Sequence, residues 1–148
     1  MKAAKKHHVD AAERARLTGL IASGLEANGA VLFAYVYGSF IEGGGAGFND
    51  IDVAVCLDDS TAGKDSLLDR QLDLSVTLGR QLGRYEVDCR VLNNAPLSFR
   101  FFAVNGGEPV FSRDEARRIE FEVRTRSLYY DFWPHAEFYY RKIVLREG

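Results

Sequence analysis

The chain has 148 residues, 47% of them hydrophobic and 27% charged, a composition that suits one globular domain with its own core over residues 1–148. Its formal net charge of -2 gives no general attraction to nucleic acid, so we expect no direct nucleic-acid partner. No run of 18 apolar residues is present, and the basic residues 1–8 lack the apolar stretch of a secretory signal, so we expect no membrane association and a cytoplasmic location.

Apolar spacing, capping residues and glycine or proline breakers predict an α/β (α+β) fold with helices packed on a sheet. The first helix follows a D-x-x-E capping box, Asp10 and Glu13, and we expect the adjacent His7 and His8 before it to be flexible and solvated. The predicted elements are, in order, a helix at about 11–28, a strand at 30–37, a loop at 40–49, a strand at 51–57, a helix at 66–82, a strand at 85–92, a short helix introduced by an Asx cap at 93–96, an edge strand at 108–111 and a last helix at about 114–146.

The helix at 66–82 is expected to pack through one side and to connect its two neighbouring strands as a β-α-β crossover. The residues assigned to that side are Leu68, Leu72, Ser75 and Leu82. The last helix should open with a second capping box, Ser112 and Glu115, and should bend or divide near Trp133 because Pro134 follows.

Residues 35–55 carry the strongest chemical signal. One predicted strand ends at Gly38 and Ser39, and the next begins with Asp50 and Asp52. Alternate residues of a strand share a face, so the two carboxylates lie about 7 Å apart on one side. They would repel each other without a divalent cation between them. The Gly-Ser turn offers backbone N–H groups and a hydroxyl to a triphosphate.

A third carboxylate, Asp88, lies inside the apolar strand at 85–92, where an unpaired buried charge would be costly, so it is either solvent-facing or functional, and we favour function. The crossover helix brings this strand within reach of Asp50 and Asp52. The three aspartates therefore predict a catalytic site in which Asp50 and Asp52 bridge Mg²⁺, and Asp88 holds a second ion or takes a proton from the attacking hydroxyl.

The loop at 40–49 contains four glycines but fits neither the dinucleotide fingerprint nor the P-loop motif. Two interpretations remain open. The glycines supply only unusual backbone angles and flexibility, or they allow the backbone to approach a nucleotide closely.

The succession Gly-Ser, Asp-x-Asp and a later strand Asp resembles the polymerase-beta-like nucleotidyltransferases, in particular the minimal nucleotidyltransferase antitoxins paired with HEPN toxins. The resemblance covers nearly the whole chain, including the V-L-N-N-A-P segment and the aromatic last helix. It implies a small mixed sheet packed by helices, with a long C-terminal helix.

The same resemblance implies the activity and the partner. The reaction would be transfer of AMP from ATP to a tyrosine hydroxyl of a HEPN ribonuclease toxin, with release of pyrophosphate. Mg²⁺ would be the cofactor, as two ions held by Asp50, Asp52 and Asp88, and Gly38 with Ser39 would bind the nucleotide.

Two departures from the family pattern keep other functions open. Phe40, Ile41 and Glu42 stand where a basic residue is frequent, and Asn49 stands where serine is usual. A non-enzymatic antitoxin that neutralises its partner by binding is therefore an alternative. A second alternative is a nucleotidyltransferase for a small hydroxylated molecule such as an aminoglycoside.

The last helix carries two stripes at helical spacing, and the second mixes aromatic and charged residues. That composition is typical of a protein interface, for which we select Arg126, Tyr130, Trp133 and Tyr140. The alternative is a helix sandwiched in the core.

The two cysteines complete the sequence analysis. Cys56 has the strand parity of Asp50 and Asp52, whereas Cys89 has the opposite parity to Asp88. If the aspartates face one site, the thiols lie on opposite faces of the sheet, so we expect no disulfide.

Overall fold

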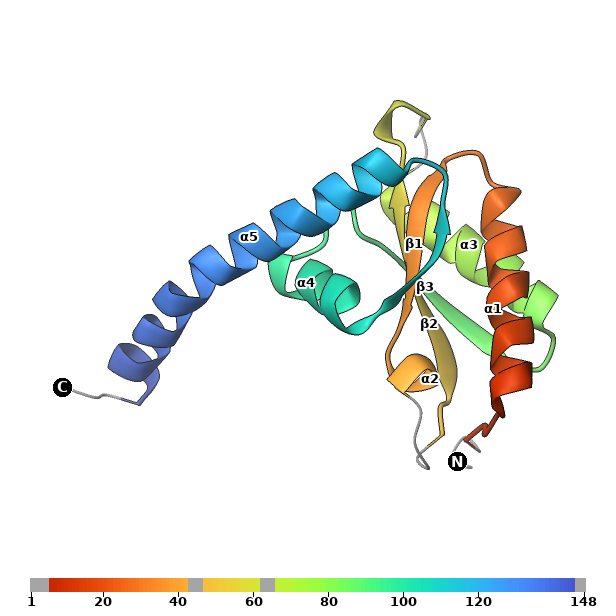
Figure 1. The fold of residues 1–148 in the computed structure, drawn as a ribbon, viewed down its shortest axis with the longest axis horizontal. Coiled ribbons are helices and arrows are strands. Elements are labelled where there is room, and N and C mark those ends of the chain that lie inside the picture. Colours follow the sequence, from red (N-terminus) through yellow and green to blue (C-terminus); the bar gives the residue numbers. More distant parts are fainter. Residues whose placement is uncertain (1–5, 43–46, 62–65, 146–148) are drawn as a thin grey trace.

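The computed structural model describes residues 6–42, 47–61 and 66–145. One four-stranded sheet in the order β3-β2-β1-β4 forms the centre, with helices on both faces (Figure 1). The elements are α1 Ala11–Glu26, β1 Val31–Tyr37, α2 Ser39–Glu42, β2 Asp50–Leu57, a 3-10 turn Asp59–Thr61, α3 Leu67–Leu82, β3 Glu86–Val91, α4 Leu97–Gly106, β4 Glu108–Ser112, α5 Glu115–Tyr139 and a π-helical turn Tyr140–Val144. The predicted mixed α/β fold is confirmed.

The sheet is mixed because its connections differ in length. β1 pairs antiparallel with β2 and with β4, whereas β2 and β3 are parallel and joined by α3. The predicted crossover is therefore present. All seven residues of the central β1 are buried, and β4, which contains Pro109, lies at an edge, where a missing N–H does least harm.

Two apolar clusters form the core, one on each face of the sheet. The larger cluster packs α1 and α3 against the sheet through residues such as Ile21 and Leu78. The smaller one lies under α4 and the start of α5 and includes Tyr37, Ala103 and Val104. Cys56 contacts the smaller cluster and Cys89 belongs to the larger, so the free thiols lie on opposite faces as predicted.

The packed side of α3 differs from the prediction. Leu68 and Leu72 are 61% and 56% exposed, whereas Leu74, Leu78 and Leu82 are buried. Both leucine sets have helical spacing, and only the second faces the sheet once β2 and β3 are paired. Ser75 lies at the edge of this side, where its hydroxyl accepts a 2.9 Å hydrogen bond from the Cys89 backbone N–H.

Two predicted caps are also wrong. Asp114, not Ser112, caps α5, and its Oδ1 accepts from the Arg117 N–H at 3.1 Å, because Ser112 is used as the last residue of β4. No side chain within the described ranges caps α4, whose N-terminal capping position is Pro96. The Asn93 side chain instead spans the end of β2, accepting from the Leu57 N–H at 2.9 Å and donating to the Leu57 carbonyl at 2.7 Å.

The segment before α1 is more ordered than predicted. His7 forms an isolated antiparallel bridge with Phe48, with backbone hydrogen bonds of 2.8 and 3.0 Å. Its ring also contacts the rings of Phe48 and Tyr85. A flexible, solvated His7 is therefore ruled out, since an aromatic neighbourhood holds it.

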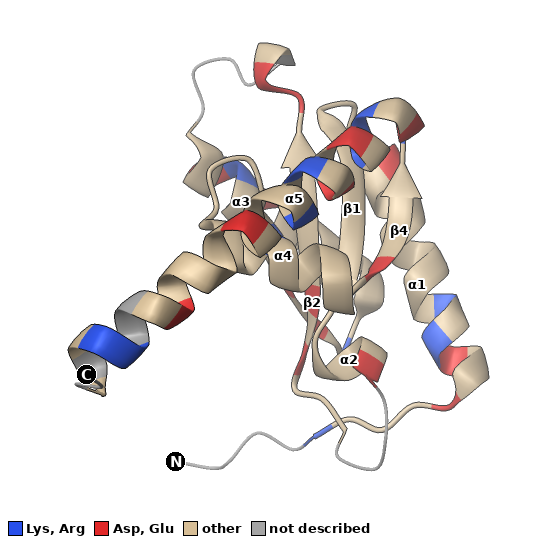
Figure 2. Cartoon of the chain, turned by 60° about the vertical axis from the view of Figure 1, so that its left-hand side comes forward, with Lys and Arg blue, Asp and Glu red and all other residues tan. Residues whose placement is uncertain are grey.

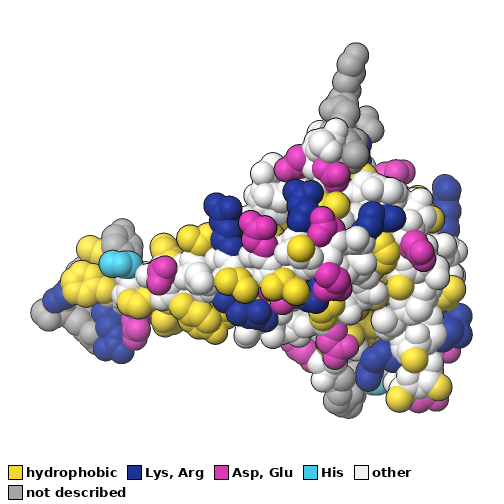
Figure 3. Space-filling view, turned by 45° about the horizontal axis from the view of Figure 1, so that its top comes forward, with side chains coloured by type: hydrophobic (Ala, Val, Ile, Leu, Met, Phe, Trp, Pro, Cys, Tyr) yellow, Lys and Arg dark blue, Asp and Glu magenta, His cyan; other side chains and the backbone are white. Residues whose placement is uncertain are grey.

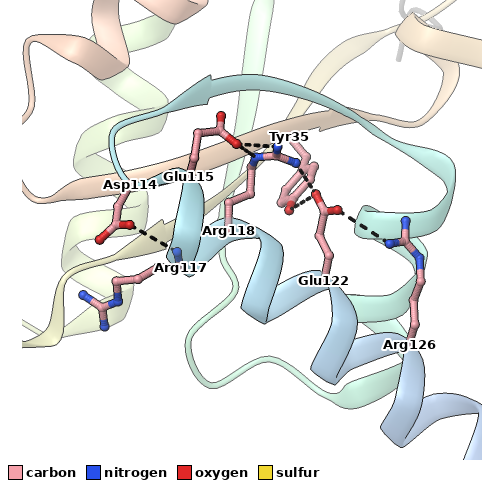
Figure 4. Close-up of polar contacts among 7 residues, drawn as sticks. All are labelled: Tyr35, Asp114, Glu115, Arg117, Arg118, Glu122 and Arg126. Carbon is pink, nitrogen blue, oxygen red and sulfur yellow. Dashed lines mark hydrogen bonds and ion pairs between the residues drawn. The ribbon is translucent and has the colours of Figure 1, made fainter.

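The first part of α5 is attached to the sheet by a polar network (Figure 4). The Tyr35 hydroxyl donates to Glu122 at 2.8 Å, and Arg118 donates to the same carboxylate at 2.6 Å. Arg126 lies 3.6 Å from the other Glu122 oxygen. Burial and the neighbouring Glu122 raise the pKa of Tyr35, so the phenol stays protonated and donates.

The rest of α5 extends away from the molecule (Figure 1). The helix continues through Pro134 to Tyr139 before the π-helical turn, so the predicted division at Trp133 is wrong. Proline removes one backbone donor, and the remaining hydrogen bonds keep the helix continuous. None of the helices in the described part of the chain could cross a membrane.

We predict that Asn93→Ala lowers the free energy of unfolding by about 1–3 kcal/mol, because it removes the partners of two strand-end backbone groups. Urea denaturation measures the change, and Asn94→Ala at the exposed neighbouring position is the control. Equal stability of the two variants would show that the Asn93 contacts contribute nothing.

Candidate active site

Three side chains of the predicted site region form a row across the sheet. Tyr37 on β1 is paired with Asp52 on β2, and Asp52 is paired with Asp88 on β3. Directly paired residues project from the same face, so the three side chains lie side by side. Asp50, two residues earlier on β2, projects from that face as well. Acidic residues mark this part of β2, near α2, in Figure 2.

Gly38 brings the predicted phosphate turn against this row. Its φ of 79° lies in the left-handed region, and a Cβ there would come within 2.5 Å of Asp52 Oδ2. Glycine is therefore required both for the backbone angle and for the close approach. Ser39 follows as the exposed first residue of α2, in which the N–H groups of Ile41 and Glu42 donate to the Gly38 carbonyl.

The electrostatics of Asp52 reflect its crowded position. Burial, followed by the negative charges of Asp88 and Asp50, raises the pKa of Asp52 to about 6, and Arg90 partly opposes the rise. Burial and the Asp52 charge also raise the pKa of the Tyr37 phenol. The face is therefore short of positive charge, a condition that a bound cation would relieve.

Arg90 and Tyr37 are site residues that sequence analysis missed. Arg90 Nε lies 3.4 Å from Asp88 Oδ2, and its guanidinium lies 5.8 Å from the centre of the Phe99 ring. The sequence did contain a signal for each residue, since Arg90 shares strand parity with Asp88 and Tyr37 directly precedes Gly38. Neither could be chosen without the register of the three strands.

The three aspartates offer the ligand type that Mg²⁺ prefers, carboxylate oxygens. Asp50, Asp52 and Asp88 supply such oxygens from one face and raise one another's affinity for positive charge. As placed, however, no three His, Cys, Asp or Glu side chains within the described ranges converge on one metal position. The chemistry of the set fits a divalent cation, and the assignment of these three residues as metal ligands stays a prediction.

Part of the predicted loop lies outside the described residues, namely Gly43, Gly44 and Gly45. At its two ends the structure shows the short helix α2 in place of the predicted loop start, and Gly47 with a φ of 74°.

Residues 20–116 match the family model described as polymerase beta, nucleotidyltransferase. The chain belongs to this nucleotidyltransferase family. The match includes Gly38, Ser39, Asp50, Asp52 and Asp88, so the resemblance stated from these motifs is confirmed at the level of the family.

Solved structures of similar fold come from toxin–antitoxin complexes. One is described as the tri-AMPylated HEPN toxin of Shewanella oneidensis in complex with MNT antitoxin. The present chain is 21% identical to the matching chain of that complex, with a TM-score of 0.64 and coverage of 90% of the present chain and 96% of the matching chain. Another is a toxin–antitoxin structure with AMP-PNP, at 22% identity and a TM-score of 0.65 over 87% and 95% of the two chains. The MntA–HepT complex matches at 20% identity and a TM-score of 0.63 over 89% and 96%. No curated protein matches the sequence.

We predict that Asp52→Asn stabilises the metal-free nucleotidyltransferase at pH 7.5. The folded-state pKa of about 6 lies above the ordinary 3.8, so protonation favours folding, and this stabilisation is lost as the pH rises through about 6. Asparagine removes the repelling charge and should add about 1 kcal/mol, a value reduced because Asp52 is only half buried.

Thermal unfolding of the metal-free proteins at pH 7.5 and pH 4 tests this prediction. The gain from Asp52→Asn should be largest at pH 7.5 and should shrink at pH 4, whereas Asp73→Asn on the exposed side of α3 should change little at either pH. A gain that does not depend on pH would contradict the electrostatic explanation.

Proposed function

We propose that this protein is an antitoxin nucleotidyltransferase that transfers AMP from ATP to a tyrosine hydroxyl of a partner HEPN ribonuclease toxin. The observation that carries the proposal is the packing of the Gly38 turn against Asp52, directly beside Asp88. The proposal assigns phosphate binding to this turn, next to the carboxylates. The choice of partner is supported by the similar chains found in complexes with toxins.

In the proposed reaction, the tyrosine oxygen attacks the α-phosphorus of ATP. A new oxygen–phosphorus bond forms, the bond between the α-phosphorus and the bridging oxygen breaks, and pyrophosphate leaves. The hydroxyl proton passes to a carboxylate, for which Asp88 is the candidate.

The residues of the site orient these groups. The backbone at Gly38 and the Ser39 hydroxyl would bind the β- and γ-phosphates, Asp50 and Asp52 would hold Mg²⁺, and Asp88 would hold a second ion or act as the base. When bound, Mg²⁺ supplies positive charge that stabilises the developing charge on the phosphates. Arg90 holds the Asp88 carboxylate in position through their ion pair.

The α5 arm, defined as residues 127–145, is the proposed surface for the toxin. Tyr130 and Trp133 are 58% and 51% exposed, and so are Phe132 and Phe138 at 55% and 63%. Hydrophobic side chains cover this projecting part on more than one side (Figure 3). The alternative of a helix sandwiched in the core is wrong for the arm, although Phe121 and Thr125 at the base do pack against the molecule.

The other two residues selected for the interface are placed differently. Arg126 immediately precedes the arm and is half buried beside Glu122, and the side chain of Tyr140 lies outside those that the structure describes.

The first experiment measures the transfer of labelled AMP from ATP to the partner protein. The protein is incubated with Mg²⁺, α-labelled ATP and the product of the neighbouring reading frame, and label should appear on that product. Asp50→Asn/Asp52→Asn should lower the transfer at least about 100-fold, because the loss of two carboxylates removes the charge that holds the metal.

The matched control is Asp69→Asn/Asp73→Asn, which removes two exposed carboxylates from α3 and should transfer normally. If the two proteins co-purify and no label is transferred by the wild type, the enzymatic proposal fails and the protein is a binding antitoxin.

A separate prediction concerns the exposed aromatic residues of the arm. Trp133→Ala or Tyr130→Ala should weaken association with the toxin by about 1–4 kcal/mol, the range of an interface hot spot, with little change in melting temperature. Calorimetric titration measures the affinity, and Leu68→Ala, at an equally exposed leucine on α3, is the control. A collapse of stability with unchanged affinity would assign these aromatic residues to the core.

A further inference from the structure

A small polar pocket lies beside the Gly38-Ser39 turn. Its volume is about 70 Å³, and its polar lining consists of His7, His8, Arg14 and Ser39. Val9, Gly47 and Phe48 complete the wall. The pocket therefore shares Ser39 with the proposed nucleotide site, although its other residues come from the N-terminal segment, α1 and the residues before β2.

The backbone bridge between His7 and Phe48 closes one side of the pocket. The bridge brings the chain so close to Gly47 that a Cβ there would lie 2.7 Å from the His7 carbonyl oxygen and 2.8 Å from His8 Cε1. Gly47 also has a φ of 74°, which disfavours other residues. The absence of a side chain at this position is thus what lets the two histidines approach Ser39.

Arg14 supplies the charge of the pocket. Its Nε is buried and has no hydrogen-bond partner within the described part of the chain. The guanidinium lies 5.9 Å from the centre of the Phe40 ring, and the nearby Glu13 is engaged by Arg16. An unpaired buried donor of this kind is costly, and an anion entering the pocket would satisfy it.

The size and position of the pocket indicate which kind of anion it would bind. A volume of about 70 Å³ is several times the roughly 10–15 Å³ that one water needs on the same measure, which leaves room for a single phosphate group. Gly38 touches the Asp52 carboxylate, and Ser39, the next residue, borders the pocket. A polyphosphate lying over this turn would therefore extend from the carboxylates to Arg14.

We propose that Arg14, assisted by His8 and Ser39, binds the terminal phosphate of the nucleotide. This inference rests on the proposed function and deepens it by adding a specificity element for triphosphates. It also explains why no basic residue follows the Gly-Ser pair in this chain. Phe40 is buried in the core there, Ile41 packs against the core and Glu42 is acidic. The positive charge is provided by α1 instead of α2.

The test compares the affinities of the intact protein for ATP and for AMP in the presence of Mg²⁺, measured by calorimetric titration. Arg14→Gln should weaken ATP binding about tenfold or more, the value of one charge-assisted hydrogen bond, and leave AMP binding unchanged. Arg14→Lys should lose less, because it keeps the charge. Inorganic pyrophosphate should compete with ATP on the wild type and more weakly on Arg14→Gln.

Arg16→Gln is the matched control, since it removes the same charge from the same helix two residues away from the pocket residue. It should bind ATP like the wild type. An unchanged ATP affinity in a folded Arg14→Gln protein overturns the inference, and so does an equal loss of ATP and AMP binding. If the wild type binds neither nucleotide, the proposed function itself fails, and this outcome is distinct from failure of the Arg14 inference alone. If Arg14→Gln does not fold, Arg14→Lys is used as the test variant.

Discussion

The pairing of β2 with β1 on one side and β3 on the other is the constraint on which the site depends. It places Asp52 directly between Tyr37 and Asp88, and it places the Gly38 turn in contact with the Asp52 carboxylate. A shift of one residue in either register would turn an aspartate toward α1 and α3, into an apolar layer that cannot accommodate a charge. The fold therefore tolerates the aspartates only in the arrangement that the proposed chemistry needs.

That arrangement has an electrostatic cost. Asp52 is half buried beside two other carboxylates, which raise its pKa, and the positive charge of Arg90 only partly opposes them. The free protein is thereby destabilised at this site, as is usual where charged groups serve a function, and in the proposed function a cation would relieve the repulsion. The pocket around Arg14 carries the opposite charge, as the proposed binding of a terminal phosphate requires.

α5 combines a fixed base with a free arm. At its base, Glu122 receives hydrogen bonds from Tyr35 and Arg118, and at the start of the arm the stacked rings of Phe101 and Tyr129 attach the helix to α4. Beyond these contacts the helix continues with aromatic residues exposed to water. A helix that is apolar on several sides is normally buried, so the arm is expected to become buried in a complex.

Local signals in the sequence were sufficient for the order and type of the four strands and of the helices other than α2, for the β-α-β crossover, and for singling out the three aspartates and the Gly-Ser turn. These features depend on periodicity, on the conformational preferences of glycine and proline, and on the cost of placing Asp inside an apolar strand, all of which act over a few residues. Local sequence patterns gave the wrong structure where two different arrangements satisfied the same pattern. The two leucine faces of α3 and the two possible caps of α5 are such cases, and strand pairing decided between them.

Only the tertiary structure could show that Tyr37 and Arg90 join the aspartates, that His7 pairs with Phe48, and that Arg14 reaches the pocket beside Ser39. These contacts join segments separated by tens of residues, and no local pattern encodes which of many charged or aromatic side chains will meet. The sequence thus determined the kind of chemistry through its short motifs, whereas the packing of distant elements decided which additional residues surround it and which part of α5 remains exposed.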